Sequence, residues 1–204
     1  MKIAIVGSGS AAFSCAINAA EKGGEVTLIE SANVIGGCCV NVGCVPSKIL
    51  IRSAQLAHQQ YSNPFDGIKK QEPILDWQLL LNQRQQRVEE LRTAKYENIL
   101  KQNPALSLVQ GKAKFINTHT LQVRDVNGNE HEITADKILI ATGAKPAIPP
   151  IEGLSDTPYW TSTEALFSKE LPEHLAIIGS SIVAVEIAQA YRRLGAQVTI
   201  LARS

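Results

Sequence analysis

The chain has 204 residues, of which 45% are hydrophobic, and its formal net charge is +1. This balance is typical of a globular protein with an apolar core, and the lack of a basic block argues against nucleic acid as the main partner. No apolar run approaches the roughly 20 residues of a transmembrane helix. The amino terminus also lacks the apolar region and cleavage site of a signal peptide, so we expect a cytoplasmic protein that does not enter membranes.

The chain opens with a strand, a turn, a helix and a second strand. The turn reads Gly7-x-Gly9-x-x-Ala12, the helix is expected over about 10–22, and Glu30 ends the second strand. Two glycines allow a tight turn and a close approach of pyrophosphate, and the helix start attracts its charge. A terminal acid can accept hydrogen bonds from ribose hydroxyls. The pattern predicts a dinucleotide-binding unit, and the alternative is a glycine turn that binds no nucleotide.

Three cysteines, Cys38, Cys39 and Cys44, fall within seven residues. In a reducing compartment such a cluster is typical of catalysis or metal binding rather than of a secreted disulfide scaffold. We expect a helix over 38–60, and a thiol near a helix start is favoured in its reactive thiolate form. Cys39 and Cys44 lie five positions apart across a turn with glycine, a spacing that permits a disulfide. We interpret the pair as a redox dithiol, and a structural zinc site is the alternative.

The middle of the chain mixes one long helix with short strands. A loop is expected over 61–75 and an amphipathic helix over 76–102, because apolar residues recur there at helical spacing. Alternating patterns and turn residues then predict the remaining strands. These strands are expected at about 106–116, 119–125, 130–134 and 137–140, and a linker with three prolines follows over 145–153.

The opening pattern occurs a second time, at an offset of 172 residues. The second turn reads Gly179-x-Ser181-x-x-Ala184, followed by a helix expected over about 182–194. Where Glu30 stands in the first copy the second has alanine, and Arg203 comes next. The loss of the acid and the gain of an arginine suit a 2′-phosphate on the ribose, so this site is expected to prefer NADPH to NADH. The alternative for Arg203 is a solvated residue after a strand.

These elements predict an α/β fold with two domains. Residues 1–153 would form a Rossmann-like domain, with a parallel sheet, helices and a small antiparallel β-meander. Residues 154–204 would begin a second Rossmann-like domain that binds NADPH.

Four motifs together resemble the flavin disulfide reductases, the family of lipoamide dehydrogenase and glutathione reductase. They are GSGSAA, GGCCVNVGCVPSK, ILIATGA and GSSIVAVE. The segments CVNVGCVPSKILIRSAQLAH and PYWTSTEAL are similar to the branch of the family that reduces mercuric ion. The resemblance implies electron flow from NADPH to FAD, to a Cys39–Cys44 disulfide and to Hg(II), which becomes Hg(0). It also implies a homodimer whose central and dimerisation domains lie outside these 204 residues.

The resemblance assigns roles residue by residue. Cys44 would face the flavin, Cys39 would meet the substrate, both would bind Hg(II), and Tyr96 would lie near the metal. FAD contacts are implied for Gly7, Gly9, Ala11, Ala12, Glu30, Gly37, Cys38, Lys48, Ala113, Thr142 and Gly143. NADPH contacts are implied for Gly179, Ser181, Glu186 and Arg203.

Several alternatives stay open at this point. Tyr96 could be an ordinary helix residue, and Glu186 could serve only packing or solvation. Cys38 stands where the family usually has threonine, so it either fills space or competes with Cys39. The function could also be that of a lipoamide dehydrogenase or glutathione reductase type, or of an inactive fragment that binds FAD or thiol ligands.

Overall fold

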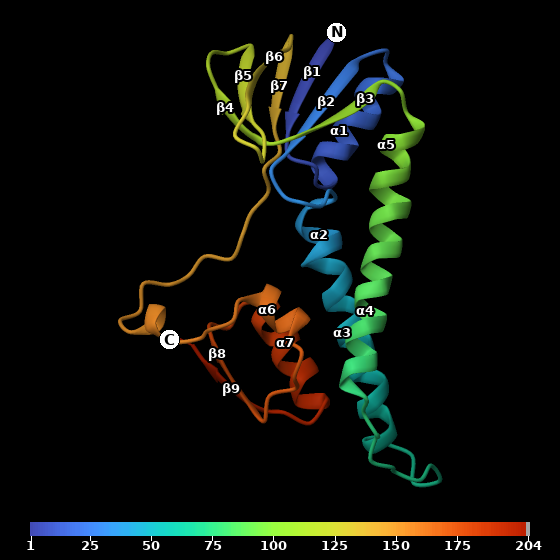
Figure 1. The fold of residues 1–204 in the computed structure, drawn as a ribbon. Helices are drawn as coiled ribbons and strands as arrows, with labels where there is room; N and C mark the ends of the chain where they lie inside the picture. Colours follow the sequence, from blue (N-terminus) through green and yellow to red (C-terminus); the bar gives the residue numbers. More distant parts are fainter. Residues whose placement is uncertain (203–204) are drawn as a thin grey trace. The chain divides into compact units, whose positions relative to one another are not determined.

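The computed structural model describes residues 1–202, and its chain divides into two compact units (Figure 1). Unit 1 comprises Met1–Asn41 and Glu89–Lys145, and unit 2 comprises Val42–Val88 and Pro146–Ser204. The domain boundary that the sequence suggested after residue 153 stays a prediction. Every helix among the described residues is too short or too polar to cross a bilayer.

Unit 1 is built on a four-stranded parallel sheet in the order β3-β2-β1-β7 (Figure 1). Its strands are β1 (Lys2–Val6), β2 (Glu25–Glu30), β3 (Leu106–Gln110) and β7 (Lys137–Ile140). The chain runs from β1 outward through β2 to β3 and then returns to the other side of β1. The carboxyl ends of β1 and β7 therefore form the point where the strand order reverses, which is the usual ligand edge of such sheets.

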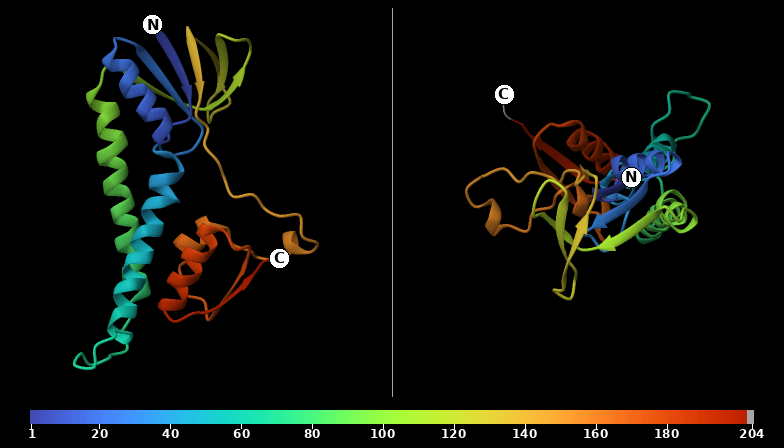
Figure 2. Two further views of the ribbon diagram at one scale, coloured as in Figure 1. Left: turned by 180° about the vertical axis from the view of Figure 1, so that it is seen from behind. Right: turned by 90° about the horizontal axis from the view of Figure 1, so that it is seen from above.

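The two faces of this sheet are covered by different layers (Figure 1, Figure 2). Because side chains alternate along a strand, Ile3 and Ile5 of β1 pack with α1 (Ser10–Glu21), whereas Ala4 packs on the other side. That side meets the antiparallel sheet β4-β5-β6, through Leu121 and Val123 of its middle strand. The antiparallel strands are β4 (Lys112–Phe115), β5 (Thr120–Arg124) and β6 (Glu130–Thr134).

Two predicted elements were wrong because each is divided. The strand expected over 106–116 breaks at Gly111, whose added Cβ would lie 2.7 Å from the carbonyl oxygen of Arg124, so β3 and β4 enter different sheets. The helix expected over 38–60 consists of α2 (Gly37–Asn41) and α3 (Cys44–Tyr61). The Asn41 side chain turns back onto the carbonyl oxygens of Ile35 and Gly37 where α2 ends.

The long helix expected over 76–102 is confirmed as a helical path but is not uniformly α-helical. It consists of α4 (Trp77–Arg92), a π-helical turn (Thr93–Glu97) and α5 (Asn98–Gln102). We call the middle segment the π turn. Such a turn holds one extra residue within a helix and is frequent at functional sites.

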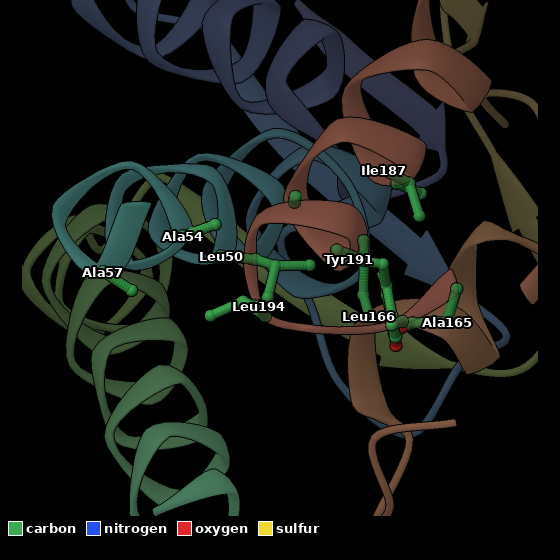
Figure 3. Packing of buried hydrophobic residues seen from close by; sticks show 10 residues of the cluster. Leu50, Ala54, Ala57, Ala165, Leu166, Ile187, Tyr191 and Leu194 are labelled. Carbon is green, nitrogen blue, oxygen red and sulfur yellow. The ribbon is translucent and has the colours of Figure 1, made fainter. Parts of the chain in front are cut away.

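Unit 2 contains the second copy of the strand–helix–strand pattern. Strands β8 (His174–Ile178) and β9 (Gln197–Leu201) pair in parallel around α7 (Ile182–Arg193), which confirms the predicted repeat. The short helix α6 (Ser162–Phe167) and α3 pack on α7. Figure 3 shows their shared apolar cluster, which includes Leu50, Ala54, Ala57, Ala165, Leu166, Ile187, Tyr191 and Leu194.

A buried arginine lies beside this cluster. Arg84 of α4 is 1% exposed, and its guanidinium lies 5.7 Å from the ring centre of Trp77 and 5.8 Å from that of Phe167. Among the described residues, nothing accepts a hydrogen bond from its Nε or Nη2 atoms. Burial lowers the pKa of this guanidinium, an effect that the nearby Tyr191 partly opposes.

Candidate functional site

The first glycine turn lies at the strand edge where the order reverses. Gly7 has φ +115°, and a side chain there would collide with the main chain of Ala141, so only glycine fits. The Gly7 amide donates to the carbonyl oxygen of Ile29 at 2.7 Å, and the Ala141 amide donates to that of Val6 at 2.8 Å. These bonds join the ends of β1, β2 and β7 around the turn.

The amino end of α1 opens toward this turn. Gly9 is its N-cap residue, and within residues 1–202 no side chain caps its first amides. Ser10 and Ala11 are exposed, and the Ala12 side chain is buried against the sheet. Uncapped amides at the positive end of the helix dipole can hold an anionic group such as a pyrophosphate.

Glu30 lies at the carboxyl end of β2, as the sequence predicted. Its Oε2 accepts a hydrogen bond from Ser8 Oγ at 2.6 Å, and its Oε1 accepts one from the Ala32 amide at 2.8 Å. The two bonds fix a half-buried carboxylate beside the glycine turn. A contact with ribose stays a prediction.

The segment that carries Cys38 and Cys39 approaches the same turn. Gly37 has φ +66°, and an added Cβ would lie 2.6 Å from the Cα of Gly9. The Gly36 amide donates to the carbonyl oxygen of Ser8 at 2.9 Å. The start of α2 is therefore fixed against the glycine turn, with Cys38 exposed and Cys39 half-buried.

Tyr96 covers this segment from the π turn. Its ring meets Phe13 edge to face, with 5.0 Å between ring centres, and lies 3.2 Å from the position of a Cβ on Gly36. Its hydroxyl is 3.0 Å from Ser10 Oγ. Tyr96 is thus built into the site of unit 1, and its proximity to a metal stays a prediction.

A polar network that the sequence did not predict contacts Asn41, at the end of the helix that carries Cys38 and Cys39. Arg92 Nη1 donates to Asn41 Oδ1 at 3.1 Å, and Arg92 Nε donates to Glu97 Oε1 at 3.3 Å. Arg92 and Glu97 lie five residues apart, a spacing that does not pair side chains on an α-helix. No sequence signal pointed to this pair, because the π turn was not predicted.

The remaining FAD candidates of unit 1 lie on two elements. Thr142 and Gly143 follow β7 and are exposed, and the Thr142 amide nitrogen lies 3.3 Å from the position of a Cβ on Gly7. Gly143 also has a positive φ, +69°. Ala113 is half-buried in β4 and packs in the cluster between the two sheets.

In unit 2, Cys44 begins α3 as an exposed free thiol. Lys48 follows it by four residues, so the two side chains share one face of the helix. Lys48 Nζ forms an ion pair with Glu186 Oε1 of α7 at 2.5 Å. The Lys48 side chain is 61% exposed and that of Glu186 37%, so the pair orients charge rather than adding much stability.

The second glycine turn repeats the backbone of the first but not its helix start. Gly179 has φ +105°, and its amide donates to the carbonyl oxygen of Leu201 at 2.7 Å. Ser181 caps α7, because its Oγ accepts from the Ala184 amide at 3.3 Å. Arg203 lies outside the described residues, so the predicted preference for NADPH stays a prediction.

The family model described as "Pyridine nucleotide-disulphide oxidoreductase" matches residues 1–204. A mercuric reductase of Shewanella putrefaciens is 68% identical over 201 residues, covering 98% of this chain and 36% of the relative. A mercuric reductase of Shigella flexneri is 57% identical over 205 residues, covering 100% and 36%. The chain therefore spans about a third of the length of the curated relatives it matches.

The fold is also that of solved flavoproteins. The Cu(II) complex of the HOCl-induced flavoprotein disulfide reductase RclA from Escherichia coli is similar with a TM-score of 0.82 and 35% identity. That match covers 98% of this chain and 41% of the other. The predicted fold class is confirmed.

Proposed function

This chain belongs to the pyridine nucleotide-disulphide oxidoreductase family, and from that premise we propose that it serves in a mercuric reductase. In this function electrons pass from NADPH through FAD and the Cys39–Cys44 dithiol to Hg(II). The observation that carries the proposal is the approach of Gly37 to Gly9, which fixes the cysteine segment beside the nucleotide turn. The identity of 68% to a mercuric reductase supports the choice of substrate.

The residues of unit 1 fit a flavin dinucleotide. Gly7 lets the turn pass against the main chain of Ala141, Gly9 lets it pass against Gly37, and the uncapped amides of α1 offer donors to a pyrophosphate. Glu30 presents its carboxylate to the ribose, and Thr142 and Gly143 border the same turn. FAD, when bound there, supplies a two-electron relay between the nicotinamide and the dithiol.

The dithiol suits mercury because thiolates are soft ligands. Cys39 and Cys44 lose their protons on binding and hold Hg(II) between two sulfurs. Overall, NADPH and Hg(II) give NADP⁺, a proton and Hg(0), so the two electrons of the hydride end on the metal. We assign Tyr96 to the metal approach, and Cys38 adds a third thiol next to Cys39.

Unit 2 contributes the positive charge of Lys48 and the start of the NADPH site. Glu186 holds the Lys48 ammonium through their ion pair, and we propose that this ammonium faces the flavin ring and stabilises its reduced, anionic form. Gly179 and Ser181 form the turn proposed for NADPH. We accordingly propose residues 1–153 as the FAD domain and 154–204 as the beginning of the NADPH domain.

Two further proposals follow from this chemistry. The cysteines must be reduced to bind mercury, and the cytoplasm keeps thiols reduced. We therefore propose that the protein is cytoplasmic. The mercuric reductase of Shewanella putrefaciens has about 64% of its length beyond the matched region, and we propose that the protein functions as a homodimer.

The test is made on the protein expressed from its complete gene. We expect a yellow protein that oxidises NADPH only when Hg(II) is added, and whose activity falls at least about a hundredfold in Cys39→Ala. Cys15→Ala is the matched control, because Cys15 packs on the core between α1 and the sheet. A colourless protein, or full activity in Cys39→Ala, would contradict the proposal. Binding of FAD without turnover would favour the flavin-binding and thiol-binding module over the enzyme.

A further inference from the structure

A single asparagine side chain holds the segment that carries Cys39. Asn41 Nδ2 donates to the carbonyl oxygens of Ile35 and Gly37, at 2.9 Å each. Its Oδ1 accepts from Arg92 Nη1 at 3.1 Å. Both amide protons and the amide oxygen are therefore engaged, which fixes the orientation of the side chain and ties the main chain on both sides of Gly36.

Arg92 is itself held by Glu97 across the π turn. The side chains are 16% and 34% exposed, and Glu97 Oε2 also accepts from Thr93 Oγ1 at 3.0 Å. On an α-helix, residues five apart point about 140° away from each other. The wider π turn brings them to the same side, so that one guanidinium reaches both Glu97 and Asn41.

We propose that Arg92 is a positioning residue for the redox dithiol, acting through Asn41. A charge-assisted hydrogen bond from Arg92 keeps the Asn41 amide facing the carbonyl oxygens of Ile35 and Gly37. The two hydrogen bonds to these oxygens in turn fix the main chain that carries Cys39. The proposal rests on the proposed function, because it requires Cys39 and Cys44 to form a disulfide. A loosened cysteine segment lowers the effective concentration of one thiol at the other and makes the disulfide harder to form.

The experiment measures the equilibrium between dithiol and disulfide in buffers of reduced and oxidised dithiothreitol. Cys39 and Cys44 form one S–S bond and give up two electrons and two protons, which convert oxidised dithiothreitol to its dithiol. Acid quenching, alkylation and mass spectrometry of the Cys39–Cys44 peptide give the oxidised fraction. The variants are Arg92→Met, Asn41→Ala and the double variant. Arg124→Met is the matched control, since Arg124 forms an exposed ion pair with Glu130 at 2.9 Å.

We expect Arg92→Met to lower the oxidation constant about tenfold, near the lower end of the range for the loss of one charge-assisted hydrogen bond. Asn41→Ala should lower it at least as much, and the double variant no further, because Arg92 acts through Asn41. Arg92→Lys, which keeps the charge and can still donate hydrogen bonds but lacks the planar guanidinium, should recover part of the loss. Arg124→Met should match the unmodified protein.

An unchanged constant in Arg92→Met, or additive losses in the double variant, overturns the positioning role. If Arg92→Met does not fold by circular dichroism, Glu97→Gln decides. That change should lower the constant about two- to threefold, and no effect overturns the proposal. If the unmodified protein forms no Cys39–Cys44 disulfide in any buffer, the proposed function itself fails, a result visible without any variant.

Discussion

Arg84 shows how one residue can work against the stability of the fold that holds it. An arginine stays protonated even when it is buried, so it brings a desolvated charge into unit 2. The rings of Trp77 and Phe167 offset part of that cost through cation–π contact. The rest of the desolvation cost is not offset, because the Nε and Nη2 atoms have no hydrogen-bond acceptor among the described residues.

We therefore expect Arg84→Met to raise the free energy of unfolding by about 1 kcal/mol, because an apolar chain of similar length replaces a buried charge whose Nε and Nη2 atoms have no acceptor among the described residues. Urea unfolding monitored by tryptophan fluorescence measures the change. Arg84→Gln, which keeps polar atoms in the same place, should not be stabilising. A loss of stability in Arg84→Met would mean that the aromatic contacts outweigh the desolvation.

Ionisation of the buried Tyr191 is expected to destabilise the fold at alkaline pH. Burial raises its pKa from 10.0 to about 12, although the positive charge of Arg84 pulls the other way. The folded state thus favours the neutral phenol, whose contribution is complete below pH 10 and is lost as the pH rises from 10 to 12. Two pKa units correspond to about 2–3 kcal/mol.

Tyr191→Phe should remove the loss of unfolding free energy that ionisation of Tyr191 causes between pH 10 and pH 12. At pH 7 it should cost about 1–2 kcal/mol, because the Ala165 carbonyl oxygen loses the donor that now lies 2.5 Å away. Unfolding at pH 7 and pH 11 measures both effects. Tyr159→Phe is the control, since Tyr159 is 42% exposed, and an equal alkaline loss in both variants would contradict the assignment.

At the scale of elements, the two glycine turns differ in how their helices begin. Gly9 leaves α1 uncapped, whereas Ser181 caps α7 with its own hydroxyl. The first amides of α1 are left to water or a ligand, whereas α7 has one of its first amides satisfied by the Ser181 side chain.

Ser181→Ala should therefore lower the free energy of unfolding by about 1 kcal/mol, and Ser181→Gly by only a few tenths. Ser180→Ala serves as control, because Ser180 is exposed and the N-cap of α7 is Ser181. Thermal unfolding of the three variants gives the comparison. Equal stability of Ser181→Ala and Ser180→Ala would show that the cap is not formed in solution.

The sequence predicted elements well where local pattern decides and poorly where distant contacts decide. Both strand–helix–strand units were predicted, because glycine turns and apolar periods are local. The break at Gly111 was not, since it depends on β3 joining β2 and β4 joining β5. The π turn was also invisible, and with it the pair of Arg92 and Glu97. Tyr96 was predicted only through the family resemblance.

At the scale of the whole molecule, a long exposed loop lies between α3 and α4. It carries the exposed Lys69 and Lys70, and Ile74 within it is 97% exposed. Lys145, in the segment that joins β7 to unit 2, precedes a proline and resists trypsin.

Limited trypsin digestion should therefore cut first after Lys69 or Lys70. The two pieces should stay together in size-exclusion chromatography, because β1 pairs with β7 in unit 1 and Leu50 shares a cluster with Tyr191 in unit 2. Denaturing gels then give the cleavage site by mass. A first cut after Lys169, or separation of the pieces without denaturant, would contradict this account.

Because β1 lies in the middle of the sheet of unit 1, the sheet can be completed only late in synthesis. The partner strand β7 is synthesised some 130 residues later, since Ile3 lies opposite Lys137. A nascent chain cannot complete the sheet, nor the turn that Ala141 closes against Gly7, until that strand has left the ribosome. Pairing across such a separation is slow to form. The Gly7 turn is translated well before β7, so its binding edge is completed only after the intervening residues have been made.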